Sequence, residues 1–136
     1  MRLDHIAYRV ADRMKTANFF INVFGYRIDP EIPNGFDITF EDGSMAKCLV
    51  LLPPENKVKG IDFKFDLPYL MGDSIEYHMA PEIFISDGSD GSIVKDWVAK
   101  RDGVGGIHHI AYQVDSVQKT MDTMLEKGYA EFEVHS

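Results

Sequence analysis

Two histidines stand at equivalent places in a short repeat, and this is the first sign of chemistry in the chain. His5 begins the run His-Ile-Ala-Tyr, and the same four residues return from His109. Each copy is followed by an amphipathic stretch that closes on Gly-Tyr, at Gly25 and at Gly128. A repeated strand and helix with a histidine at one fixed place puts two imidazoles in symmetry-related positions. Such a pair favours a site for a divalent metal ion.

A carboxylate would complete such a site, and Glu82 is the best candidate. Two neutral imidazoles and one carboxylate are a common ligand set for divalent ions that do Lewis-acid or oxygen chemistry. Glu82 is the only acid on the inward face of a strand made otherwise of Ile, Phe and Ile. An unpaired buried carboxylate is costly to desolvate, so a metal ligand is one interpretation of Glu82. An edge-strand carboxylate that faces water is the other.

Arg9 and Gln113 share the faces of the two histidines, because strand residues two and four apart point the same way. Arg9 lies four residues after His5, and Gln113 lies four residues after His109. An arginine at this place predicts binding of a substrate carboxylate, with pairing to an acid across the sheet as the alternative. The same alternation directs His108 away from the site. No residue stands out as a general base.

Hydrophobic periodicity predicts the elements that must position these side chains. The first unit is expected to contain strands at residues 3–10, 26–32, 36–40, 45–52 and 81–86, with a helix between the first two. Asp12 can cap this helix and Gly25 can end it. The helix should cover the more apolar face of the first strand, so His5 faces the opposite side, toward the hollow of the sheet.

A linking helix at residues 92–101 is expected before the second copy of the repeat. The second unit should contain a strand at 107–114, a helix at 116–127 buried through Val117, Met121, Met124 and Leu125, and a strand that starts at 130–134. The first unit then spans 1–104, with an insertion near 55–79, and the second spans 105–136. The second unit has fewer strands and is incomplete. A longer chain or a second subunit would supply the missing strands, and unpaired strand edges favour a homodimer.

Composition and charge exclude several classes of partner. The chain has 136 residues, of which 45% are hydrophobic and 26% charged, as expected for one globular domain with a real core. A formal net charge of -8 opposes binding to nucleic acid or to acidic membrane surfaces. No apolar run has the length of a membrane helix. We therefore expect a cytoplasmic protein whose partner is a small-molecule substrate.

The residues quoted above resemble the vicinal oxygen chelate superfamily, which includes glyoxalase I, methylmalonyl-CoA epimerase, extradiol dioxygenases and 4-hydroxyphenylpyruvate dioxygenase. The most specific part is the run Gly-Gly-Ile-His-His-Ile-Ala-Tyr at residues 105–112, with Asp-His-Ile-Ala-Tyr at 4–8 as its counterpart. The resemblance covers most of the chain apart from 55–79. It implies an α+β fold in which paired βαβββ modules form a half-barrel around one divalent metal ion, here with the second module truncated.

The resemblance also implies a site and an activity. In epimerase-like and glyoxalase-like members the ligands come from the first and last strands of each module, which places His5, Glu82 and His109 at three ligand positions. The fourth, a late glutamate, has no counterpart here. The implied cofactor is a divalent ion (Zn, Fe, Co, Mn, Ni or Mg), and the implied activity is of the glyoxalase or epimerase type, on a small oxygenated acid or thioester through an enolate-like intermediate. An iron-dependent dioxygenase resembling the 4-hydroxyphenylpyruvate type and a non-catalytic small-molecule-binding module are the alternatives.

Overall fold

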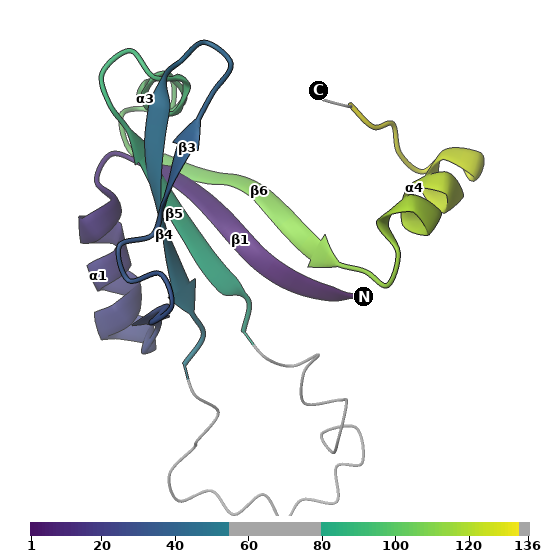
Figure 1. The fold of residues 1–136 in the computed structure, drawn as a ribbon, viewed down its shortest axis with the longest axis horizontal. Coiled ribbons are helices and arrows are strands. Elements are labelled where there is room, and N and C mark those ends of the chain that lie inside the picture. The colour runs from purple at the N-terminus through teal and green to yellow at the C-terminus, as the bar shows by residue number, and fades with distance from the viewer. Residues whose placement is uncertain (55–79, 134–136) are drawn as a thin grey trace, which may run out of the picture.

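A mixed sheet forms the body of the molecule in the computed structural model, which describes residues 1–54 and 80–133. The strand order is β2-β4-β5-β1-β6, and β3 also pairs with β4. The described elements are β1 (Arg2–Val10), α1 (Arg13–Phe24), β2 (Arg27–Ile28), β3 (Phe36–Thr39), β4 (Met45–Leu52), β5 (Glu82–Gly88), α3 (Ile93–Ala99), β6 (Gly105–Gln113) and α4 (Val117–Glu126). β1 and β5 run parallel, and the other paired strands run antiparallel. This arrangement confirms the expected α+β fold (Figure 1).

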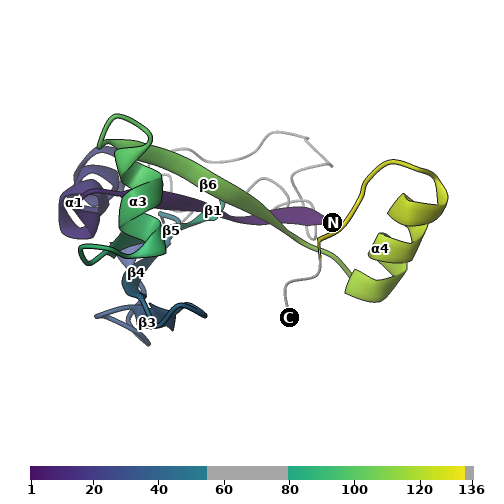
Figure 2. The same cartoon turned by 90° about the horizontal axis from the view of Figure 1, so that it is seen from above.

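The helix α1 covers one face of the sheet, as the sequence predicted (Figures 1 and 2). The Asp12 side chain caps its first turn by accepting a backbone hydrogen bond at 3.1 Å, and Gly25 ends it in the left-handed conformation at φ 74°. Between them, Ala17 is fully buried and the Phe20 ring lies 5.4 Å from that of Tyr8 on β1. The core under the helix contains Val10, Ala17, Tyr26, Leu49, Leu51, Ile83 and Ile85.

The second expected strand is shorter than predicted. Instead of residues 26–32, β2 contains only Arg27–Ile28, and turns follow it. The physical reason is that Pro30 and Pro33 have no backbone N–H to donate to a neighbouring strand. The chain then rejoins the sheet as β3, which pairs with the beginning of β4, whereas β2 pairs with its end. The other strands expected in the first unit are β1, β3, β4 and β5, with ends that agree within two residues.

The two copies of the repeat meet where β6 lies antiparallel beside β1. His5 lies opposite Ala111, and His109 lies opposite Ala7. The two histidines are therefore diagonal neighbours, two positions apart on adjacent strands, and share one face of the sheet. The strand pairing thus gives the repeat a local two-fold symmetry.

The second unit is less tightly packed than its helix pattern predicted. α4 forms where expected, but none of its residues is buried, and Figures 1 and 2 show it standing away from the sheet. Val117 is 67% exposed and Leu125 is 51% exposed, so the predicted burial of this helix is wrong. An amphipathic helix is buried only where another element covers its apolar face, and β6 is the one strand of the second unit among the described residues. The further strand expected from residue 130 is absent over 130–133.

The linking helix is confirmed as α3, which joins β5 to β6 and is capped by the buried Ser92. The division of the chain into units 1–104 and 105–136 stays a prediction. The expected insertion near 55–79 lies outside the described residues. Within the part that the structure describes, no helix is both long and apolar enough to cross a membrane.

Candidate functional site

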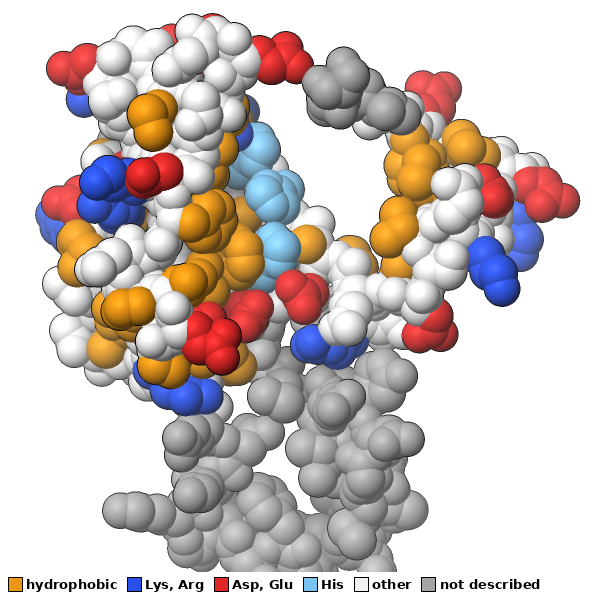
Figure 3. Space-filling view, in the orientation of Figure 1, with side chains coloured by type: hydrophobic (Ala, Val, Ile, Leu, Met, Phe, Trp, Pro, Cys, Tyr) orange, Lys and Arg blue, Asp and Glu red, His pale blue; other side chains and the backbone are white. Residues whose placement is uncertain are grey.

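The concave face of the sheet holds a cavity of about 310 Å³ beside the two repeat histidines. Its basic residues are His5, Arg9, His108 and His109, and its aromatic walls include Phe36, Phe40 and Phe84. Figure 3 shows histidine side chains in a column beside apolar side chains on this face. A mostly apolar cavity with a few convergent polar groups is typical of a small-molecule site.

The two repeat histidines lie in contact at this cavity. The centroids of the His5 and His109 rings are 5.6 Å apart, and the ring planes make an angle of 77°. His5 is the more buried of the two, because its ring stacks on Phe84 at 4.0 Å with only 7° between the planes. Both imidazoles therefore reach the same hollow, which is the juxtaposition that the repeat predicted.

Each histidine has a partner on its Nδ1 atom, and in both cases the partner is the preceding residue. The Asp4 carboxylate lies 2.9 Å from Nδ1 of His5, and Nδ1 of His108 lies 2.8 Å from Nδ1 of His109. In both rings this leaves Nε2 as the nitrogen that is available to a metal or a substrate. A carboxylate on the second ring nitrogen, as Asp4 provides for His5, is a usual way in which proteins orient metal-binding histidines.

The prediction that His108 points away from the site is wrong, because β6 contains a bulge. Ala7 lies opposite His109 and Tyr8 lies opposite Ile107, so His108 is an extra residue without a partner on β1. A bulge breaks the alternation of side chains between the two faces of a strand. His108 consequently lines the cavity together with His109.

Glu82 lies next to His5 in the sheet, directly opposite it in the register of β5 and β1. β5 is a central strand, so the interpretation of Glu82 as an edge-strand carboxylate is wrong. Burial raises the pKa of Glu82, the negative charges of Asp4 and Asp29 raise it further, and the positive charges of His5 and Arg2 oppose this increase. Glu82 lines a neighbouring cavity of about 330 Å³ with Arg2 and Asp4, and does not line the histidine cavity itself.

The donors present are of the kind that a divalent ion takes, namely two imidazoles and a half-buried carboxylate whose charge is poorly compensated. Across residues 1–54 and 80–133, however, no three His, Cys, Asp or Glu side chains come close enough together to hold an ion. His5 and His109 therefore provide two suitable ligands for such an ion. Glu82 could join them only through a change in its side-chain position.

A cationic end closes the cavity on the side of α3. The Arg9 guanidinium lies 5.8 Å from the ring centroids of both Phe40 and Trp97, and that of Arg101 lies 3.7 Å over Trp97. Burial and the charge of Arg101 lower the pKa of Arg9. No carboxylate among the described residues forms an ion pair with Arg9. This guanidinium is therefore available to an anionic ligand.

Gln113 is not brought to the cavity. It lies opposite Arg2 at the far end of the β1 and β6 pair, is exposed, and is not among the residues that line the histidine cavity. The strand carries it away from the site even though it follows His109 by an even number of residues.

The sequence model of the Glyoxalase/Bleomycin resistance protein/Dioxygenase superfamily matches residues 4–135 of this chain. The chain belongs to this superfamily. The match confirms the resemblance drawn from the His-Ile-Ala-Tyr repeat. No curated protein matches the chain.

Solved structures with the same fold include a selenomethionine methylmalonyl-CoA epimerase, with a TM-score of 0.59 at 22% identity over 94% of this chain and 71% of that one. A hypothetical protein from Bacillus halodurans C-125 has a TM-score of 0.56 at 20% identity, over 93% and 68% of the two chains. Methylmalonyl-CoA epimerase from Mycobacterium tuberculosis has a TM-score of 0.52 at 17% identity, over 93% and 64%. These likenesses support the glyoxalase-type fold.

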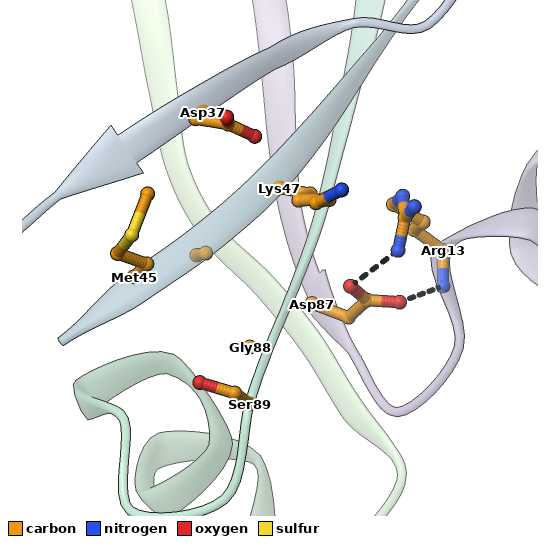
Figure 4. Close-up of a pocket in the computed structure, with 8 residues that line it drawn as sticks. Arg13, Asp37, Met45, Lys47, Asp87, Gly88 and Ser89 are labelled. Carbon is orange, nitrogen blue, oxygen red and sulfur yellow. Dashed lines mark hydrogen bonds and ion pairs between the residues drawn. The ribbon is translucent and has the colours of Figure 1, made fainter.

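A second cavity of this glyoxalase-type sheet has no histidine in its lining. It has a volume of about 360 Å³ and lies where β3, β4 and β5 approach the start of α1 (Figure 4). Asp87 accepts hydrogen bonds from the backbone N–H of Arg13 at 2.7 Å and from its guanidinium at 3.0 Å. Arg13 and Asp87 form an ion pair with each other there, whereas Arg9 in the histidine cavity has no carboxylate partner among the described residues, so the histidine cavity is the better candidate site in this superfamily member.

Sequence reasoning missed three residues that shape the site. Phe84 shares the face of Glu82 by simple alternation, and this signal could have placed it against His5. Trp97 belongs to the linking helix α3, and its ring centroid lies 5.4 Å from that of His108. His108 itself had no such signal, because bulges do not follow from hydrophobic alternation.

Proposed function

We propose that this superfamily member is a divalent-metal-dependent enzyme of the glyoxalase or epimerase type, acting on a small oxygenated acid or thioester through an enolate-like intermediate. The observation that carries the proposal is the pair of repeat histidines at one cavity, with ring centroids 5.6 Å apart and Nδ1 of each ring already engaged. His5 and His109 would bind the ion, and Glu82 would be the third ligand. When bound, a divalent ion supplies a Lewis acid that stabilises negative charge on a substrate oxygen.

Arg9 would bind the carboxylate or another anionic group of the substrate. Its guanidinium lies at the cationic end of the cavity, and the nearby Arg101 makes an anion there more favourable. The cavity volume of about 310 Å³ suits a small ligand. The acidic net charge of -8 argues against nucleic acid or an acidic membrane as the partner.

The test is hydrogen exchange at the carbon next to the substrate carbonyl. Purified protein would be incubated in D₂O with each divalent ion in turn and with small acyl thioesters and 2-oxo acids, and loss of the proton would be followed by NMR. We expect ion-dependent exchange that is abolished in His5→Ala and retained in Gln113→Ala, since Gln113 lies outside the cavity. Exchange at equal rates in His5→Ala and the unchanged protein would refute the proposal. Oxygen uptake with ferrous iron and no exchange would indicate the dioxygenase chemistry instead.

A non-catalytic binding module is the second candidate, favoured by one observation. The cavity walls are largely apolar and aromatic, and the described residues bring only two ligands of one ion together. A binding module predicts that the protein binds an apolar ligand in the presence of a chelator and exchanges no protons. The matched comparison is Phe84→Ala, which removes an aromatic wall of the cavity without touching the bonded nitrogens of either histidine.

A further inference from the structure

We propose that Asp4 and His108 are matched positioning residues, which hold His5 and His109 in the tautomer whose Nε2 carries the free lone pair. This inference rests on the proposed function, because a metal-binding imidazole must present an unprotonated nitrogen. It assigns a role to two residues that do not themselves bind the ion.

The first step is the relation between the two bulges. Asp4 is an extra residue in β1, between the Leu3 and His5 pairings, and His108 is an extra residue in β6. The repeat relates these positions, since Asp4 precedes His5 as His108 precedes His109. In a regular strand, adjacent side chains point to opposite faces and their ends stay apart. At both bulges the adjacent side chains instead meet, at 2.9 Å and 2.8 Å.

For His5 the donor and acceptor are determined by the chemistry of the partner. An ionised carboxylate only accepts hydrogen bonds, so Nδ1 of His5 carries the proton and donates it to Asp4. Nε2 of the same ring is then unprotonated. The stacking on Phe84, at 4.0 Å and 7°, holds the plane of this ring.

For His109 the partner is an imidazole, which can either donate or accept. At 2.8 Å between two imidazole nitrogens, one ring donates the hydrogen bond and the other accepts it. If His109 donates, its Nε2 is free as in His5; if His108 donates, the proton of His109 lies on Nε2 and blocks the ligand position. The symmetry of the repeat favours the first arrangement, and the contact of Trp97 with the His108 ring at 5.4 Å and 78° holds that ring beside its neighbour.

The direct test is nitrogen NMR on metal-free protein with ¹⁵N-labelled histidine, at a pH where the rings are neutral. We expect His5 and His109 to show a protonated Nδ1 and an unprotonated Nε2, and His108 to show the opposite. In Asp4→Ala and His108→Ala, the adjacent repeat histidine should revert to the Nε2-protonated form that free neutral histidine prefers. Asp4→Asn and His108→Asn keep an oxygen acceptor and should restore the tautomer. Unchanged tautomers in both alanine variants would overturn the proposal.

Titration with Zn²⁺ separates this inference from the proposed function. Loss of an outer hydrogen-bond partner commonly lowers metal affinity by about 10–100-fold, so we expect a loss of that size in each alanine variant and its recovery in the asparagine variants. Gln113→Ala on the same strand is the control and should bind as the unchanged protein does. If the tautomers behave as expected but no ion binds to any form, the proposed function fails and the positioning roles stand. If Zn²⁺ binds equally to all forms and the tautomers do not respond, the positioning roles fail and the metal site stands.

Discussion

Glu82 carries its charge at a cost to stability, as functional carboxylates often do. It is half-buried on a central strand, near the negative charges of Asp4 and Asp29, and its pKa is raised. A carboxyl group whose pKa is higher in the folded state than in the unfolded state destabilises the fold once the pH exceeds the unfolded value. Metal binding would remove this penalty.

We therefore expect Glu82→Gln to raise the melting temperature of the metal-free protein at pH 7. The increase should shrink as the pH falls toward the ordinary carboxyl value of about 4.3, where the charge is lost in both states. In metal titrations the same variant should bind less tightly but still bind, because an amide oxygen can ligate. Thermal unfolding at several pH values measures the first effect, and equal melting temperatures at pH 7 would contradict the account.

The adjacent residues His108 and His109 predict that stability depends on pH with the opposite sign. Burial lowers the pKa of His108 and of His109 in the folded protein, with Arg9 adding to both decreases. Stability from these neutral rings is complete above the unfolded value of about 6.5 and is lost as the pH falls below it toward the lowered folded value. The double variant His108→Gln with His109→Gln should show a smaller loss of melting temperature between pH 7 and pH 5. If the double variant lost as much melting temperature as the unchanged protein, other groups would be responsible for the sensitivity to acid.

At the residue scale, the repeat was sufficient to predict that His5 and His109 share one hollow. The position of His108 could not be predicted, because a bulge inserts a residue without changing the hydrophobic pattern of the strand. The position of Gln113 relative to the cavity could not be predicted either. Alternation gives the face on which a strand residue lies but does not show whether the cavity extends that far along the strand.

At the scale of elements, Gly105 sets where β6 joins β1. Its φ is +86°, and a Cβ atom there would lie 2.0 Å from the backbone oxygen of Arg9. Gly103 has a similar φ of +70° but nothing within 4 Å of its Cβ position. A side chain at position 103 would therefore cause backbone strain alone, whereas a side chain at position 105 would also clash with the backbone of β1.

We expect Gly103→Ala to lower the free energy of unfolding by about 1–2 kcal/mol, the usual cost of the left-handed conformation. Gly105→Ala should cost more, because the backbone of β1 must also move away, and this movement would disturb Arg9. Chemical denaturation of both variants measures the difference. Equal losses would show that β6 does not require this close approach.

Elements with clear end signals were predicted well, and the others were not. Asp12 and Gly25 marked the two ends of α1, and this helix lies between them. The linking helix expected at 92–101 is present as α3. The strand expected at 26–32 ends at Ile28, because Pro30 within it and Pro33 directly after it cannot donate backbone hydrogen bonds to a neighbouring strand. The helix α4 was correctly predicted as a helix, but periodicity indicates only which face is apolar and not what covers it.

At the scale of the whole molecule, the second unit leaves apolar surface exposed. Ile107, Ile110 and Tyr112 on β6 are each at least half exposed, as are Val117 and Leu125 on α4. Exposed apolar side chains along a strand and a neighbouring helix favour association. We propose that the protein forms a homodimer through this surface.

Sedimentation equilibrium tests the dimer. We expect a concentration-dependent dimer for the unchanged protein and a shift toward monomer for Leu125→Lys, which places a charge on the exposed apolar face of α4. Lys119→Ala on the same helix is the control and should leave the equilibrium unchanged. A monomer over the whole concentration range would contradict the proposal.

The central claim is that one divalent ion binds between the two repeat histidines. Elemental analysis of the protein, purified without chelator and then dialysed, tests this most directly. The account predicts about one divalent ion per chain in the unchanged protein and in Gln113→Ala, and almost none in His5→Ala or His109→Ala, because each ring supplies one of the ligands that bind the ion. The same metal content in His5→Ala, His109→Ala and the unchanged protein, or no divalent ion in any of them, would contradict it.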